Sequence, residues 1–162
     1  MTEPSRDSPA TTEREPQSLA DSVSNILEEA RMILPGTQTL FGFQLIVVFN
    51  QTFQDRLSAA EQYLHLVATA LVALATALLL APAAYHRRVE PEAVSRRFVL
   101  LSTRLLSWSM TPLALAVCAD FYLVASVATR RGLLSAVLAV ALLAVFVGLW
   151  IVLPRRQASF DR

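Results

Sequence analysis

Residues 132–154 read GLLSAVLAVALLAVFVGLWIVLP, a run of 23 residues without a charged side chain. A helix rises about 1.5 Å per residue, so this run can cross a hydrocarbon core roughly 30 Å thick. With histidine taken as neutral, three further windows are uncharged apart from Asp120 in the last of them: residues 33–54, 62–86 and 105–129. Buried helices of a soluble fold are the alternative, but they would leave no amphipathic layer to face water. The sequence therefore predicts an all-α fold, a bundle of four transmembrane helices.

The composition agrees with a membrane location. Hydrophobic residues make up 54% of the chain and charged residues 17%, whereas soluble domains carry roughly 25% charged residues. Ten of the 27 charged side chains fall within residues 1–31, which leaves 17 for the other 131 residues. The net charge of +1 provides no field that would attract nucleic acid. We therefore expect the lipid bilayer as a partner, and no nucleic acid.

The polar amino-terminal segment divides into a tail and a helix. Residues 1–17 are rich in Pro, Ser, Thr and Glu, a composition that cannot offset the entropy of ordering, so we expect a disordered acidic tail. They also lack the basic start of a cleaved signal peptide. Residues 18–34 begin with Ser18, a helix-capping residue type, and place apolar residues at helical spacing, which predicts a short amphipathic helix. Pro35 and Gly36 are expected to break or kink the chain, one continuous kinked helix being the alternative.

The membrane domain is expected to cover residues 35–154. Its predicted spans are at about 36–54, 62–85, 104–129 and 132–153, and a cytoplasmic tail follows at 155–162.

Arginines near the span ends indicate the orientation, because basic residues are enriched in cytoplasmic loops. If both termini are cytoplasmic, nine arginines lie inside and three outside. The inner ones are Arg31, Arg87, Arg88, Arg96, Arg97, Arg104, Arg155, Arg156 and Arg162, and the outer ones are Arg56, Arg130 and Arg131.

The inner loop at residues 87–104 has room for structure. Pro91, between two glutamates, is typical of a helix start, and this helix is expected to run into the third span without a break. The acidic helix at 19–31 could dock on Arg96 and Arg97, because their charges are opposite. Contact of these arginines with lipid headgroups is the alternative.

Small residues at regular spacing let transmembrane helices approach closely. Such stripes run along the second and fourth spans, at Thr69, Ala73, Ala77 and Ala81 and at Gly132, Ala136, Ala144 and Gly148. They are expected to be contact faces, either within one bundle or between subunits.

Asp120 is the one acidic residue well inside a predicted span. A carboxylate in hydrocarbon is costly, so this side chain is expected to face the bundle or a wet cavity. Asn50 and His65 fall in the same outer half of the bundle, and Gln44 lies near the middle of its span. A histidine and a carboxylate suit a proton relay, so Asp120, His65, Asn50 and Gln44 form a candidate proton or ion site.

Each of these residues also has a structural interpretation. Asp120 can be a hydrogen-bonded residue that joins helices, and His65 can reach headgroups or water from near its span end. Gln44 and Asn50 can be packing contacts. Pro112 is expected to kink the third span before Asp120, as in transporters, although prolines are also tolerated in membrane helices.

Patterns for catalysis and cofactor binding are missing from the sequence. Cys118 is the one cysteine, so the chain has no internal disulfide and no thiolate cluster for a metal. His65 and His86 fall at opposite ends of one span, about 32 Å apart in a helix, too far to share a metal. The chain has four glycines and no phosphate-binding glycine loop. No enzymatic activity, metal or cofactor is expected.

Two sequence elements resemble a known family. They are Leu-Pro-Gly-x-Gln at 34–38, within the stretch 30–53, and Ala-Pro-x-x-x-His-Arg at 81–87. The chain resembles, over residues 25–153, a family of small four-span bacterial membrane proteins of unknown function. The resemblance implies an inner-membrane protein without an established activity, and some descriptions of similar proteins call them sodium/proton antiporters. The matching positions are Arg31, Pro35, Gly36, Gln38, Pro82, His86 and Arg87, most of them expected at the cytoplasmic face.

Two functional hypotheses follow. The favoured one is a non-enzymatic membrane module whose cytoplasmic face, around residues 34–36 and 86–87, engages lipid headgroups or a partner protein. The other is a small proton-coupled transporter or cation/proton antiporter in which Asp120 carries the proton. A transporter of this size is expected to be a homo-oligomer, because four helices enclose little room.

Overall fold

The computed structural model describes residues 19–89 and 95–153. The predicted tails at 1–17 and 155–162 and the predicted helix start at Pro91 lie outside the described residues. The elements in chain order are α1 (Leu19–Val47), α2 (Gln51–Arg56), α3 (Ala59–Val89), α4 (Arg96–Thr129), α5 (Gly132–Val147) and a π-helical turn (Gly148–Val152). The described part of the chain contains no strand. The predicted all-α fold is confirmed.

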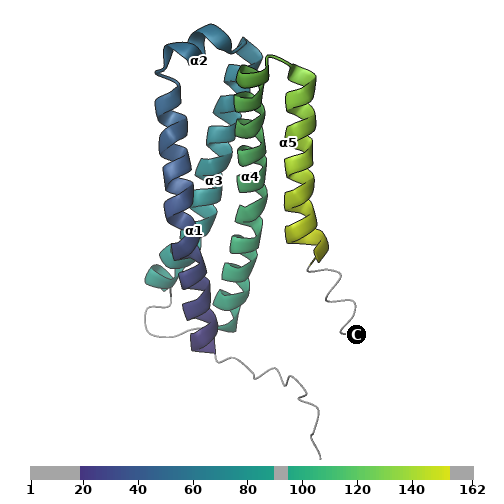
Figure 1. Cartoon of the computed structure of the whole chain (residues 1–162). Helices are drawn as coiled ribbons and strands as arrows, with labels where there is room; N and C mark the ends of the chain where they lie inside the picture. The colour runs from purple at the N-terminus through teal and green to yellow at the C-terminus, as the bar shows by residue number, and fades with distance from the viewer. Residues whose placement is uncertain (1–18, 90–94, 154–162) are drawn as a thin grey trace, which may run out of the picture.

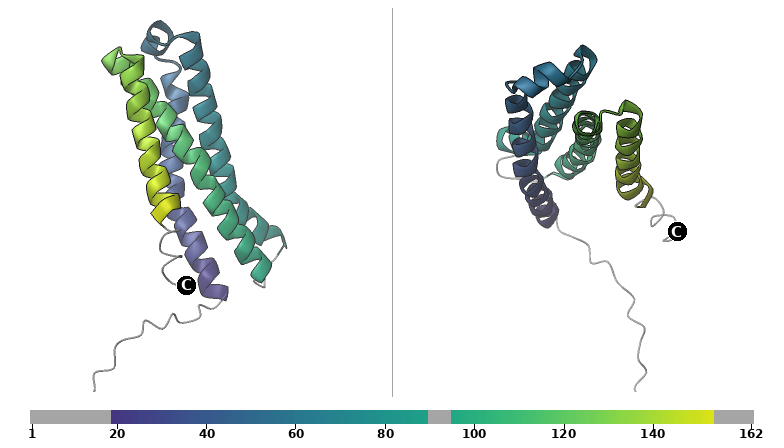
Figure 2. Two further views of the ribbon diagram at one scale, coloured as in Figure 1. Left: turned by 90° about the vertical axis from the view of Figure 1, so that its right-hand side faces the viewer. Right: turned by 45° about the horizontal axis from the view of Figure 1, so that its top comes forward.

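Helix α4 lies at the centre of the bundle (Figure 1). It contacts α3 most extensively, and it also contacts α1 and α5. The turned views in Figure 2 show α5 on the side of α4 that faces away from α1 and α3. The short helix α2 crosses the end of the bundle between α1 and α3.

Two small apolar clusters hold α1, α3 and α4 together. Ala68 and Val72 pack on Ala116 toward the α2 end of the bundle. At the opposite end, Ile26, Leu79 and Leu106 pack together. Alanines in the first cluster let the helix backbones approach closely there. The two clusters align the three helices along most of their length.

Three described helices are long and apolar enough to cross a membrane: Ala59–Arg88, Arg96–Thr129 and Gly132–Val152. The prediction of spans two to four therefore has the support of the structure. Helix α1 is not among them, because Arg31, Gln38 and Gln44 interrupt its apolar sequence. A fourth span is not confirmed.

The outward faces of these helices are strongly apolar. On α5, Leu133 is 83% exposed and Val140 is 65% exposed. Ser135 of α5 is buried, and its hydroxyl is hydrogen-bonded to that of Thr129 on α4. Soluble monomers rarely expose continuous apolar surface of this kind, so the exposed faces agree with a lipid environment.

Helix α1 passes through Pro35 and Gly36 without ending. The amphipathic segment at 18–34 is therefore not a separate helix, and the alternative of one continuous helix is the one observed. Thr39 donates a hydrogen bond from its hydroxyl to the Pro35 carbonyl at 2.8 Å, and Thr37 donates to the Leu34 carbonyl at 2.9 Å. A proline removes one helical N–H, and nearby hydroxyls together with the rest of the ladder can keep the helix intact.

The first predicted span, at 36–54, extends past the end of the observed helix. Helix α1 ends at Val47, and residues predicted to complete the span, up to 54, instead enter α2. The Asn50 side chain accepts a hydrogen bond from the Thr52 N–H at 2.9 Å, which caps the new helix. Phe53, 7% exposed, anchors α2 to the bundle.

The acidic first part of α1 lies against the bundle through apolar contacts. Val23 and Ala30 are buried, and Ile26 packs on the α3 and α4 side chains of its cluster. In the described part of the chain no ion pair joins the glutamates of this segment to Arg96 or Arg97, and both arginines are exposed. The contact that the structure describes is made by burial of apolar side chains, and docking through opposite charges stays a prediction. Helix α4 begins at Arg96 after the extended N-cap residue Ser95 and continues to Thr129. The predicted helix that runs from Pro91 into the third span without a break is therefore interrupted at Ser95.

The small-residue stripe on α3 does not face its neighbours within the chain. Ala73 and Ala77 are exposed. The buried face of α3 carries Ala68, Val72 and Leu79 instead. Because one residue turns a helix by about 100°, a stripe displaced by one position points along a different face.

Candidate functional site

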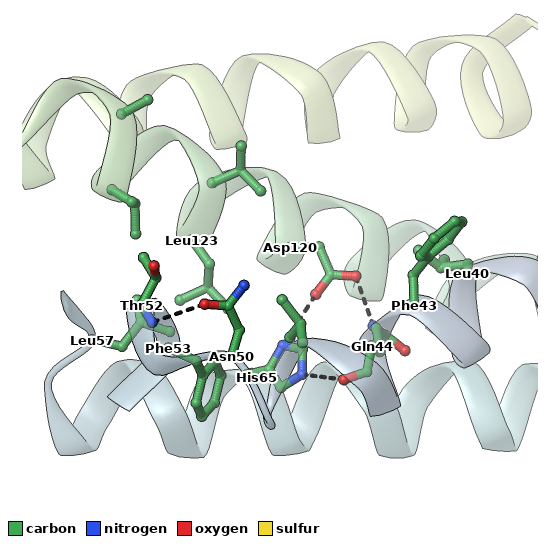
Figure 3. A pocket seen from close by; sticks show the side chains of 14 residues that line it. Leu40, Phe43, Gln44, Asn50, Thr52, Phe53, Leu57, His65, Asp120 and Leu123 are labelled. Carbon is green, nitrogen blue, oxygen red and sulfur yellow. Dashed lines mark hydrogen bonds and ion pairs between the residues drawn. The ribbon is translucent and has the colours of Figure 1, made fainter. Parts of the chain in front are cut away.

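Three polar side chains meet in the half of the bundle nearest α2. They are Gln44 from α1, His65 from α3 and Asp120 from α4 (Figure 3). Gln44 Nε2 donates a hydrogen bond to Asp120 Oδ2 at 2.6 Å. His65 Nδ1 lies 3.8 Å from Asp120 Oδ1, and His65 Nε2 lies 2.9 Å from the Gln44 carbonyl. Gln44 thus binds the aspartate through its side chain and the histidine through its backbone.

The His65 ring reaches the backbone near the end of α1. Gln44 belongs to the last turn of α1, which ends at Val47. A carbonyl oxygen has two lone pairs, so the Gln44 carbonyl can accept a hydrogen bond from the His65 ring in addition to one from a helical N–H.

The same contact fixes the tautomer of His65. A carbonyl oxygen can only accept, so His65 Nε2 must carry the hydrogen that lies between it and Gln44. His65 Nδ1 therefore faces the carboxyl group of Asp120 with a lone pair when the ring is neutral and with a proton when it is charged. At 3.8 Å the two atoms are too far apart for a direct hydrogen bond, but close enough for a strong electrostatic interaction.

The three side chains differ in burial. Gln44 is 3% exposed and His65 is 5% exposed, while the Asp120 side chain is 20% exposed. Burial of His65 excludes the interpretation in which it reaches headgroups or water. Gln44 Oε1 is buried without a hydrogen-bond partner among the described residues. An unpaired buried amide oxygen is costly, so this atom is an available acceptor.

An open cleft of about 530 Å³ lies beside these three residues. Its walls come from α1, α2 and α4, with His65 of α3 among the lining residues. Most lining side chains are apolar, among them Leu40, Phe43, Phe53, Leu123, Val124 and Val127. A cleft with apolar walls and a few convergent polar groups is the usual form of a ligand site.

Asn50 lines the same cleft in another role. Its side-chain oxygen is occupied by the N–H of Thr52 at the start of α2. The structure thus brings Gln44, His65 and Asp120 together and leaves Asn50 as a helix cap on the cleft wall.

Two features near the site were missed from the sequence. Phe53 packs edge-on against His65, with ring centroids 5.1 Å apart. Ser58 and Glu61 form a reciprocal capping box at the start of α3: the Ser58 N–H donates to Glu61 Oε2 at 2.9 Å, and the Glu61 N–H donates to Ser58 Oγ. The Ser-x-x-Glu spacing is the sequence signal of such a box. Glu61 Oε1 also accepts a hydrogen bond from Ser126 of α4 at 3.0 Å.

The seven motif positions of the resemblance do not form one site. Pro82 is fully buried on α3. His86 packs its ring against Phe98 of α4, with centroids 5.4 Å apart. The remaining positions are exposed: Arg31, Pro35, Gly36, Gln38 and Arg87. Within the described ranges, no hydrogen bond links one of the seven side chains to another.

The described residues contain no group of three or more His, Cys, Asp or Glu side chains that could hold a metal ion. Cys118 is buried on α4 as a free thiol.

Comparison with known proteins places the chain in a family. A family model matches residues 12–154. No curated protein and no solved structure matches the chain. The matched model is described as a family of unknown function, DUF6328. The match covers most of the chain, and the chain therefore belongs to this family of unknown function.

Proposed function

We propose that the chain is a small proton-coupled transporter of the membrane, and that His65 and Asp120 hold the proton. One observation carries the proposal: the Asp120 carboxyl group lies between His65 Nδ1 and Gln44 Nε2 beside an open cleft. This role is non-enzymatic, since the cleft needs to bind and release ligands without changing a covalent bond.

The electrostatics of the pair favour one proton, carried either by His65 or by Asp120. With no proton, the His65 Nδ1 lone pair would face an anionic carboxylate. With two protons, a cationic ring would face a neutral acid and lose its counter-ion. One proton gives either an imidazolium and a carboxylate or a neutral pair, both of which are favourable. A site that prefers one proton over none or two is suited to proton coupling.

Access to the pair is provided by the cleft. The Asp120 side chain is partly exposed on it, while His65 and Gln44 are buried behind. A buried carboxyl group without such access would exchange its proton only when the bundle opened. Intramembrane acids that face a cavity are typical of ion and proton pathways.

The proposal includes a fourth span formed by α1. Helix α1 runs alongside α3 and α4 (Figure 1). Two of its polar residues, Thr37 and Gln44, are buried and face the protein, while Gln38 and Thr39 are exposed. We place both termini in the cytoplasm of a bacterium, on the inner membrane, because the arginine distribution favours this orientation. The cleft would then lie in the outer half of the bilayer.

The test uses the full chain in vesicles that contain a pH-sensitive dye. Imposed sodium, potassium or organic-cation gradients should drive a proton flux, and Asp120→Asn should lower this flux at least tenfold. Asp55→Asn is the matched control, because Asp55 is an exposed carboxylate on α2 that does not line the cleft. Absence of flux from the parent protein with every cation would overturn the proposal, as would full activity of Asp120→Asn.

A second proposal concerns the opposite end of the bundle. Arg31, Arg87, Arg96, Arg97 and Arg104 are all exposed there, and arginine guanidinium groups bind phosphate oxygens in a bidentate way. We propose that this face engages anionic lipid headgroups, or an acidic surface of a membrane-protein partner or second copy. Native mass spectrometry of the gently purified protein should find retained anionic lipid that Arg87→Gln and Arg96→Gln together reduce. An unchanged lipid complement would contradict the lipid form of this proposal.

A further inference from the structure

We propose that the cleft binds a lipophilic organic cation, with the cationic group on Asp120 and the apolar body against the aromatic and aliphatic walls. This inference rests on the proposed function and names the substrate class of the same site.

The charge of the cleft selects a cation. Among the described residues that line the cleft, Asp120 is the one acidic residue and none is an arginine. His65 is the titratable group that faces Asp120 from α3, and Gln44 faces it from α1 without a charge. When the proton of this pair leaves, the carboxylate therefore has no cationic partner within the cleft. An organic cation would supply one.

The hydrogen-bonding groups select a donor. Asp120 offers carboxyl oxygens, and Gln44 Oε1 is a buried acceptor without a partner in the described structure. Gln44 is 3% exposed, and it lines the cleft beside Asp120. An ammonium group that reached this point would donate one N–H to the Asp120 carboxylate and another to Gln44 Oε1. A ligand with only acceptors would leave Gln44 Oε1 unpaired, which is unfavourable.

The walls select an apolar body of limited size. A volume of about 530 Å³ falls within the roughly 300–1,000 Å³ of small-molecule sites. Phe43 and Phe53 both line the cleft; Phe43 is exposed, while Phe53 is buried with its ring against His65. Aromatic rings attract cations through their faces, so two phenylalanines beside a carboxylate favour a lipophilic cation over a hydrated metal ion.

Binding and proton release are coupled by charge balance. One positive charge enters the cleft and one proton leaves the pair formed by His65 and Asp120, so the charge of the site is unchanged. No bond other than the one to the proton breaks. Exchange of this stoichiometry is what an antiporter requires.

The experiment compares two fluorescent ligands that share one ring system, pyrenemethylamine as the ammonium and pyrenemethanol as the neutral alcohol. Each is titrated into the full-length protein in detergent, with ligand fluorescence as the binding signal and a pH dye in weak buffer as the proton signal. The ammonium should bind at least tenfold more tightly than the alcohol and release protons. Asp120→Asn should abolish this preference, while Asp55→Asn should retain it.

Controls keep the result interpretable if a variant is damaged. Helical content and elution volume are measured first, and Asp120→Glu, which keeps the charge, should bind the ammonium. Equal binding of the amine and the alcohol by the parent protein would overturn the inference, even where proton flux in vesicles upholds the proposed function. Tight ammonium binding without proton release would uphold the ligand class and overturn proton coupling.

Discussion

The two ends of the α3–α4 pair are built differently, although each contains a histidine of α3. At one end, His65 is held by a backbone carbonyl and faces Asp120 beside an open cleft. At the other end, His86 packs against Phe98, which is 1% exposed and also stacks on Tyr85. The end with His65 has an open cleft beside its polar groups. At the end with His86, the aromatic rings of Tyr85, His86 and Phe98 pack together.

The comparison shows that residue type did not decide the role of either histidine. His65 has an acid within electrostatic reach, and its other nitrogen is fixed. His86 Nδ1 is buried without a hydrogen-bond partner in the described structure, and its ring packs against Phe98. The family motif includes His86, yet His65 is the histidine that lies close to an acidic side chain, that of Asp120.

The largest expected effect comes from breaking the packed end. Phe98→Ala should lower the free energy of unfolding by about 3–5 kcal/mol, because it removes a buried ring from between Tyr85 and His86. Unfolding of the purified protein in mixed detergent micelles, followed by circular dichroism, measures this change. Phe121→Ala is the matched control and should cost far less, since Phe121 is 41% exposed. Equal losses in the two variants would show that the two ends do not differ in packing.

A smaller effect is expected at the polar end. Gln44→Leu keeps the size of the side chain but removes the donor to Asp120, and hydrogen bonds to charged groups contribute roughly 1.5–3 kcal/mol. The unfolding free energy should fall by about that amount. Gln38→Leu, on an exposed face of the same helix, should have little effect.

The origin of the Gln44 effect can be isolated with a double-mutant cycle. In an Asp120→Leu background, Gln44→Leu should cost clearly less than in the parent protein, because its hydrogen-bond partner is gone. An undiminished loss would mean that Gln44 acts through packing, and it would weaken the proposed site.

The smallest effect is expected at the motif glycine of α1. Gly36 is inside an unbroken helix, and a Cβ added there would meet no atom within 4 Å. Gly36→Ala should therefore raise the unfolding free energy by about 0.5–1 kcal/mol through helix propensity. Gly42→Ala, in the same helix outside the motif and equally free of neighbours, should give a similar gain. A loss confined to Gly36→Ala would assign the motif a role that the structure does not show.

Much of the fold could be predicted because it depends on local properties. An uncharged run of sufficient length predicts an apolar helix wherever it occurs, and the helices α3, α4 and α5 follow the predicted windows. The boundaries near Pro35 and Val47 could not be predicted in this way. A proline ends a helix only when the surrounding contacts fail to hold it, and α1 packs on α3 and α4 on both sides of Pro35.

The site was only partly accessible from sequence. Asp120 could be singled out because a charge inside an apolar span has a cost that demands a partner. Its partner Gln44 lies 76 residues away in the chain, and nothing in the spacing of residues fixes how far each helix is rotated about its axis. Because helix rotation could not be predicted, Asn50 was expected to share a site with Asp120. In the structure the Asn50 side-chain oxygen caps α2 instead.

The sequence by itself determined the helical class, three apolar helices able to cross a membrane and the one acid in their interior, because length and hydropathy need no knowledge of neighbours. Only the tertiary structure decided which polar groups meet. Gln44 contacts His65 through its backbone carbonyl and Asp120 through its side-chain amide. Those contacts depend on helix rotation and on where a helix stops, and both are set by packing between segments far apart in the chain.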